Sequence, residues 1–142
     1  MQNTLVGLVL LLMAAACLAA PQDVAAHGYT LHYNALPSAT LSEEMARQHG
    51  ILRSRGTGVL IVSVQAESEE GSVPAHVEAQ AIDGHSQPVD ISWRTVRVGE
   101  YISYLGTFRV RDGESIRFSL SATPRGSDVT LSEYFRQSFA AD

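Results

Sequence analysis

Along most of this chain, apolar and polar residues alternate with a period of two. In the clearest run, at 116–122, Ile116, Phe118, Leu120 and Ala122 are separated by polar residues. Successive side chains of a β-strand point to opposite faces, so such a run predicts a strand with one buried face. Comparable runs predict strands at 29–35, 73–81, 89–94, 102–110 and 129–139.

One further run, Val59–Val64, is apolar on both faces and predicts a central strand. The predicted strands are seven in all, and short turn segments join most of them. This spacing is typical of an all-β protein, and we expect an immunoglobulin-like antiparallel β-sandwich.

A single segment breaks the β pattern between the first two predicted strands. Ser42 is a favoured residue before a helix, Glu43 and Glu44 suit its positive N-terminal end, and Gly50 can end it. We therefore predict one short helix from Glu43 to His49.

The first residues predict export. Residues 5–13 are apolar apart from Gly7, small residues follow, and Pro21 comes next, which is typical of a secretory signal. The apolar part is shorter than the ~20 residues that a membrane span needs. We expect a signal at 1–19, an extension at 20–28 and one domain at 29–142, with no transmembrane span after cleavage.

The position at which the signal is cleaved decides whether Cys17 stays in the exported protein. We favour a cut after Ala19; a cut after Ala16 would leave Cys17 as the first residue, available for a lipid anchor. Cys17 is the single cysteine, so the exported domain contains no disulfide and depends on its apolar core.

The charge balance excludes some partners. The chain has fifteen acidic residues and ten basic ones, all of which are arginine, for a net charge of −5. Nucleic acids and anionic membranes favour clustered cations, so we expect no nucleic-acid partner.

A cut after Ala26 gives the sequence its one specific metal hypothesis. It would make His27 the N-terminal residue, whose amine and imidazole can chelate Cu(II), and His32 could complete the site. Copper binding or trafficking is therefore an alternative function. The five histidines are otherwise scattered, and we predict no cofactor.

Catalytic signals are weak. The Gly-x-Ser-x-Gly motif is absent, and a buried carboxylate at Glu133, on the apolar face of the last predicted strand, is the one candidate acid. An unrecognised hydrolase stays an alternative, but we expect no enzyme. Arg53 and Arg55 flank a glycine-bearing loop that could hold an anion, although solvated arginines explain it more simply.

Three blocks of the sequence resemble a known family. They are His32–Pro37 with the helix segment and Arg53-Ser54 after it, Arg97–Arg109, and Phe135–Phe139. This chain resembles domain-of-unknown-function family 4426, small exported proteins of Gram-negative bacteria, over nearly the whole exported part. The resemblance implies a periplasmic β-sandwich without an established activity.

The resemblance also suggests site residues. The recurrent positions of the family fall on His32, Tyr33, Asn34, Arg53 and Tyr104. The two tyrosines lie on predicted core faces, where they would pack, which leaves His32, Asn34, Arg53 and the neighbouring Arg55 as binding candidates. We expect a non-catalytic periplasmic module that uses a sheet edge or a loop end to bind a protein or a small ligand.

Overall fold

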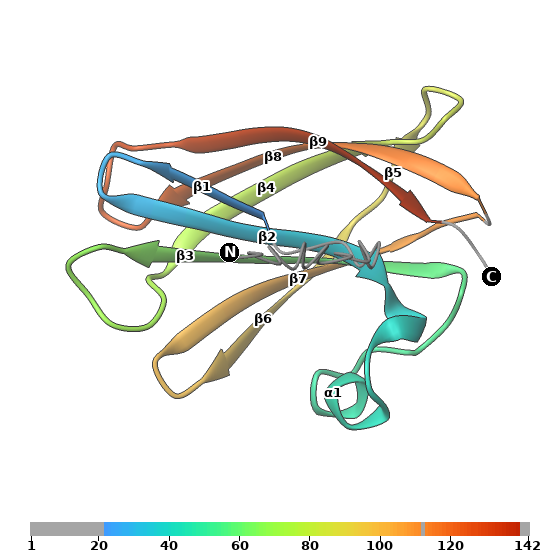
Figure 1. Ribbon diagram of the computed structural model, residues 1–142, viewed down its shortest axis with the longest axis horizontal. Coiled ribbons are helices and arrows are strands. Elements are labelled where there is room, and N and C mark those ends of the chain that lie inside the picture. Colours follow the sequence, from blue (N-terminus) through green and yellow to red (C-terminus); the bar gives the residue numbers. More distant parts are fainter. Residues whose placement is uncertain (1–21, 112, 140–142) are drawn as a thin grey trace, which may run out of the picture.

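Two antiparallel sheets packed face to face form the protein (Figure 1). The computed structural model describes residues 22–111 and 113–139, so the expected signal at 1–19 and Cys17 lie outside the described residues. In those ranges, no helix is long and apolar enough to cross a membrane. The predicted antiparallel β-sandwich is confirmed.

The first sheet, sheet A, has five strands in the order β1, β2, β3, β7, β6. Their bounds are Gln22–Ala26 (β1), Tyr29–Pro37 (β2), Thr57–Ala66 (β3), Tyr101–Arg109 (β7) and Ser92–Val98 (β6).

The second sheet, sheet B, has four strands in the order β5, β4, β8, β9. Their bounds are Pro88–Val89 (β5), Ala75–Ile82 (β4), Glu114–Pro124 (β8) and Leu131–Phe139 (β9). Between β2 and β3 lie a short 3₁₀ turn, η1 (Ser38–Thr40), and the helix α1 (Glu43–Gln48).

The domain begins earlier than predicted. Residues 20–28 were expected to be an extension, but Gln22–Ala26 pair with β2 as strand β1. Val24 and Ala26 pack against the core while Asp23 and Ala25 are exposed, so this short run obeys the same alternation as the longer strands. Its five residues are too few for the pattern to stand out beside the apolar segment before them.

The predicted strand at 89–94 is divided between the two sheets. Pro88–Val89 pair with β4 in sheet B, and Ser92–Val98 pair with β7 in sheet A. Val89 and Ile91 both pack against the core, because the chain stays on the inside of the sandwich as it crosses from one sheet to the other. Apolar and polar residues therefore keep alternating while the chain passes from sheet B to sheet A, so the sequence pattern did not show the change of sheet.

The main core lies between the sheets and is rich in aromatic rings. Leu31, Leu60 and Ile116 have no exposed surface. The Phe118 ring stacks on Phe135 with centroids 4.9 Å apart. Tyr33 lies on the core face with 4 % exposure and Tyr104 packs against the same cluster, so both tyrosines occupy the interior as predicted.

Helix α1 forms a third, partial layer on the outer face of sheet A (Figure 1). The Oγ of Ser42 accepts a hydrogen bond from the Met45 N–H at 3.1 Å, and His49 follows the last helical residue, which confirms the predicted helix to within one residue. Leu41 and Ala46 form a second apolar cluster with Val59 and Leu105 of the sheet.

A buried hydroxyl ties this helical segment to the sheet. Ser38 has no exposed surface, and its Oγ lies 3.0 Å from the Leu52 carbonyl oxygen and 2.9 Å from that of Ser54. The same oxygen accepts a hydrogen bond from the Ser54 N–H at 2.9 Å. One side chain thus joins the start of the segment to the loop that follows α1.

We expect Ser38→Ala to lower the free energy of unfolding by about 1–3 kcal/mol, because it leaves a partly buried N–H and a partly buried carbonyl without their partner. Urea unfolding followed by circular dichroism measures the change. Ser132→Ala is the matched control, since Ser132 is exposed, and it should stay within about 0.5 kcal/mol of the parent. Equal stabilities for the two variants would contradict this role of Ser38.

Candidate functional site

The outer face of sheet A is apolar over a wider area than α1 covers. Val59 and Ile61 of β3, Leu105 of β7 and Val96 of β6 all point to this face. Beside the helix they form the floor of a cavity of about 190 Å³, here called the helix groove. Leu41, Met45, His49 and Ile51 form one wall, and Val98, Tyr101 and Ser103 complete the lining.

A second cavity of about 200 Å³, the loop groove, lies beside the first half of β6. The segment Gly50–Leu52, the segment Ser92–Arg94 and Thr107 line it. The Arg94 guanidinium donates a hydrogen bond to the carbonyl oxygen of His49. Because His49 lines the helix groove and Arg94 lines the loop groove, this contact lies between the two cavities.

Two of the predicted site residues, His32 and Asn34, lie on the same outer face. Asn34 pairs with Ile61, a floor residue of the helix groove, but is not itself one of the lining residues. His32 is half-buried, with its Nδ1 2.5 Å from Asp23 Oδ1 and its Nε2 2.7 Å from Gln65 Oε1. Both ring nitrogens are therefore engaged, and Asp23 and Gln65 hold His32 in place on the outer face of β2.

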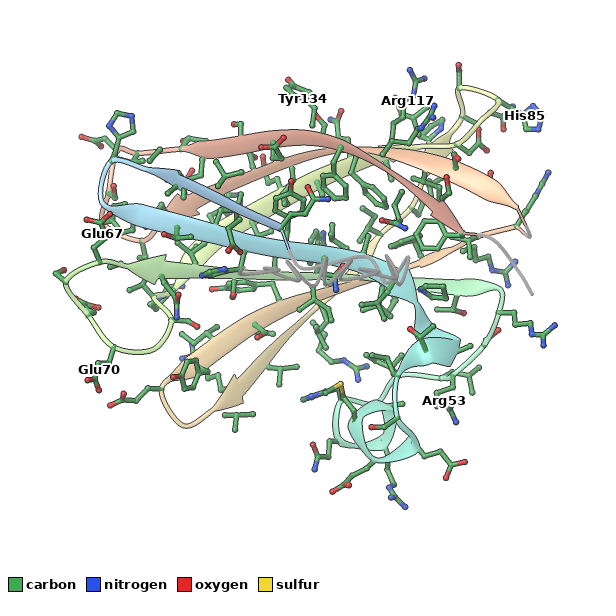
Figure 2. All side chains as sticks on the ribbon, in the orientation of Figure 1. Arg53, Glu67, Glu70, His85, Arg117 and Tyr134 are labelled. Atoms are coloured by element: carbon green, nitrogen blue, oxygen red, sulfur yellow. The ribbon has the colours of Figure 1, made fainter. Side chains whose placement is uncertain are left out.

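The other two predicted residues, Arg53 and Arg55, lie elsewhere. Arg53 donates a hydrogen bond to the Ala39 carbonyl oxygen at 3.1 Å, and its guanidinium lies 3.6 Å from Glu43 Oε1. Arg55 is exposed in the turn before β3. Figure 2 shows Arg53 on the helical segment, away from the sandwich. The structure does not bring these arginines together with His32 and Asn34, and the Arg53 guanidinium holds the backbone of Ala39.

The copper hypothesis finds no geometric support. His27 lies in the turn between β1 and β2 with a φ of 53°, whereas His32 is the fourth residue of β2, about 10 Å along the strand from Tyr29, where the turn ends. Within residues 22–111 and 113–139, no three histidine, cysteine, aspartate or glutamate side chains gather as a metal site would require. A cut after Ala26 would also remove β1 and the Asp23 partner of His32.

Glu133 lies on the inner face of sheet B, next to the place where β9 approaches β1 and β2. It is partly buried, and none of the hydrogen bonds or ion pairs among the described residues involves it. A carboxylate without a hydrogen-bonded partner lacks the paired acid and base of a hydrolytic site. The geometry therefore gives the hydrolase alternative no support.

Sequence reasoning missed the residues of β6. Val96 and Val98 lie beyond the end of the strand predicted at 89–94, and their run contains polar residues on both faces. Only the register against β7, Val96 with Ser103 and Val98 with Tyr101, shows that they line the helix groove. The one available signal was the resemblance block starting at Arg97, which covers Val98 and Tyr101.

Comparison with known proteins gives a family and a fold. A family model described as a domain of unknown function, DUF4426, matches residues 24–142. A crystal structure of a DUF4426 family protein from Pseudomonas aeruginosa PAO1 has a TM-score of 0.73 at 23 % identity, covering 86 % of this chain and 96 % of that one. Among curated proteins, no sequence matches the chain.

More distant structures share the sandwich. FetP of uropathogenic E. coli strain F11, expressed recombinantly in the periplasm of E. coli BL21(DE3), has a TM-score of 0.57 at 9 % identity and covers 84 % of this chain and 95 % of its own. A copper-bound variant of that FetP has a TM-score of 0.54 at 10 % identity, with 83 % and 95 % covered. At these identities the likeness concerns the fold alone.

A buried phenol, Tyr33, marks the side of the sandwich where β1 meets β9. Its hydroxyl donates a hydrogen bond to Gln22 Oε1 at 2.8 Å, and its ring lies 4.6 Å from that of Phe135. Burial raises the pKa of Tyr33, and the negative charges of Glu133 and Asp23 raise this pKa further. The folded protein therefore holds this proton more tightly than the unfolded chain does.

We expect the free energy of unfolding to fall as the pH rises above about 10, because the unfolded state then loses the Tyr33 proton first. Below that pH both states are protonated and the contribution is intact. Urea unfolding at about pH 8 and about pH 11 measures the loss, which should be smaller in Tyr33→Phe. The control Tyr134→Phe, at a side chain that is 79 % exposed, should keep the parent's slope. If Tyr33→Phe lost as much unfolding free energy between the two pH values as the parent does, the raised pKa of Tyr33 would not be the cause.

Proposed function

We propose that this chain, which belongs to the DUF4426 family of domains of unknown function, is a non-catalytic binding module of the periplasm that takes its partner on the outer face of sheet A. The observation that carries the proposal is the helix groove. It is an apolar cavity of about 190 Å³ that neither the sheet nor α1 fills.

Three exposed large apolar side chains lie together around this groove. Met45 is 47 % exposed, Tyr101 58 % and Val98 64 %, and all three line it. Single exposed apolar side chains are ordinary on a protein surface, but a contiguous group around a cavity is typical of a binding site. A partner that covered these residues would remove apolar surface from water.

The polar groups at the rim favour an occupant with hydrogen-bonding capacity. Ser103 lines the groove, and Asn34 lies beside its floor residue Ile61. The titratable lining residues are His49 and Tyr101, with no carboxylate among the side chains of the groove. Apart from these two residues and Ser103 the lining is apolar, which is typical of a binding site.

Export to the periplasm is supported by the apolar segment at 5–13 and the small residues after it. The distant neighbour FetP was expressed in the periplasm, which agrees with such a location. The copper of the FetP variant is not carried over to this chain, since His27 and His32 do not meet and both His32 nitrogens are already engaged.

A photo-crosslinking amino acid placed in the groove tests the proposal in cells of a Gram-negative host that export the full chain. Incorporated at Met45 or at Val98, it should give the same adduct. Incorporated at Tyr134, it should give none, because Tyr134 projects from the outer face of sheet B, on the side of the molecule away from α1 (Figure 2).

Two variants make this experiment specific. With the probe at Met45, Val98→Arg should abolish the adduct, since it puts a charge into the groove, while Val98→Thr should retain it. An adduct that persists in Val98→Arg, or that forms equally from Tyr134, would contradict the groove as the binding site.

A further inference from the structure

Strand β6 is an open edge of sheet A. In the order β1, β2, β3, β7, β6 it comes last, and the described part of the chain pairs it with β7 alone. The opposite edge differs, because β1 lies against β9 of the other sheet. In Figure 1, β6 is the lowest strand of the sandwich, with α1 beside it.

The turn after β6 fixes which backbone groups face outward. Gly99 and Glu100 form a two-residue turn between Val98 and Tyr101, with Gly99 at a φ of 59°. The Val98 carbonyl of such a turn points at Tyr101, and hydrogen-bonded pairs recur at every second residue of an antiparallel ladder. The N–H and C=O groups of Trp93, Thr95 and Arg97 therefore point away from β7, along the open edge.

Both cavities lie along this edge. Val96 and Val98 line the helix groove, whereas Ser92 and Arg94 line the loop groove. Each cavity, at about 190 and 200 Å³, is smaller than the roughly 300–1,000 Å³ of a drug-sized ligand site. Their centres are about four residues apart on β6, or about 13 Å, which is also the separation of residues i and i+4 on one face of an extended strand.

The inner side of β6 carries the groups that would select the partner. Trp93 and Arg97 point to this side, where sheet B covers them only in part, and Trp93 is 38 % exposed. Gly106 makes room for the Trp93 ring, because a Cβ there would lie 3.2 Å from it. Among the ion pairs of the described residues, none involves Arg97.

The charges of β6 argue against a second copy as the occupant. Pairing two β6 edges would put the two Arg94 guanidinium groups on the outer face of one two-stranded ribbon and the two Arg97 groups on its inner face. Like charges on adjacent strands destabilise the pairing. A strand that carries carboxylates would instead be attracted to Arg97.

We propose that β6 binds an extended peptide of a partner protein as an added strand of sheet A, with two large apolar side chains four residues apart and a carboxylate beside Arg97. The apolar side chains occupy the helix groove and the loop groove, and the backbone pairs with Trp93, Thr95 and Arg97. This inference rests on the proposed function and specifies its partner. Such strand addition obtains affinity from backbone hydrogen bonds and specificity from alternate side chains.

A random twelve-residue peptide library displayed on phage, selected on the folded protein, tests the inference. The expected winners carry large apolar residues at i and i+4 with Asp or Glu between them. Thr95→Pro should weaken their binding by about tenfold, because it removes one outward N–H without breaking the ladder to β7. Thr95→Val keeps that N–H and should bind as the parent does.

Arg97→Glu provides a second test that does not depend on a proline being tolerated. The same library selected on this variant should yield Lys or Arg in place of the acidic residue. Thermal unfolding of each variant shows whether it is folded.

The remaining outcomes separate this inference from the proposed function. If selected peptides bound the Thr95→Pro variant as tightly as the parent and failed to bind the Val98→Arg variant, binding as an added strand would be contradicted. That result would leave the helix groove as the binding site. If phage were enriched no more on the parent protein than on the Val98→Arg variant, the inference of a peptide partner would be contradicted. The crosslinking experiment in cells tests the helix groove independently of this result. If sedimentation showed that the parent is a dimer and that the Thr95→Pro variant is a monomer, a second copy of the chain would occupy β6. That result would also contradict the inference of a peptide partner.

Discussion

Strand β3 has apolar side chains on both of its faces, so both faces of sheet A must be covered. Leu60, Val62 and Val64 point inward and Val59 points outward, and all four are fully buried. Burying one such side chain stabilises the fold by about 1.5–3 kcal/mol. Sheet B covers the inner face of β3 completely. On the outer face the six residues of α1 cover Val59 but leave Ile61 and Val96 only partly buried, and this incomplete cover forms the helix groove.

A six-residue helix is not stable by itself, so α1 depends on contacts outside it. Ser38 and Arg53 hold its two flanking segments by hydrogen bonds to backbone groups. Arg94 adds a bond from the edge strand β6 to the carbonyl of His49, just after the last turn. One arginine thus connects the wall of the groove with the open edge. A strand added to β6 would lie directly beside the residue that positions α1.

The alternation of apolar residues predicted the sandwich because it reports directly which side chains are buried. It failed at 88–98 because burial is the same on the inner faces of the two sheets, so a crossing between them leaves the alternation intact. His32 and Asn34 lie on the same outer face as the helix groove but do not line it, whereas Met45, Val96 and Val98 do. Met45 is distant in sequence from the two valines, and it lies beside them because α1 packs on sheet A. Arg53 stays a predicted binding residue, and the sequence did not show that its guanidinium has a carbonyl partner, Ala39.

Open strand edges are hazards that natural sheets protect, and the edges of this sandwich are protected in different ways. Strand β1 lies against β9, and β5 pairs with the end of β4. Strand β6 has instead two arginines, which oppose pairing with another copy of itself. The same charges cannot repel a strand that carries carboxylates, so protection against self-association and selection of an acidic partner have a single physical cause. Glu67 and Glu70 lie at one end of the molecule (Figure 2), together with Glu100 in the turn that follows β6. A carboxylate of the partner would be repelled if it lay beyond that end of β6.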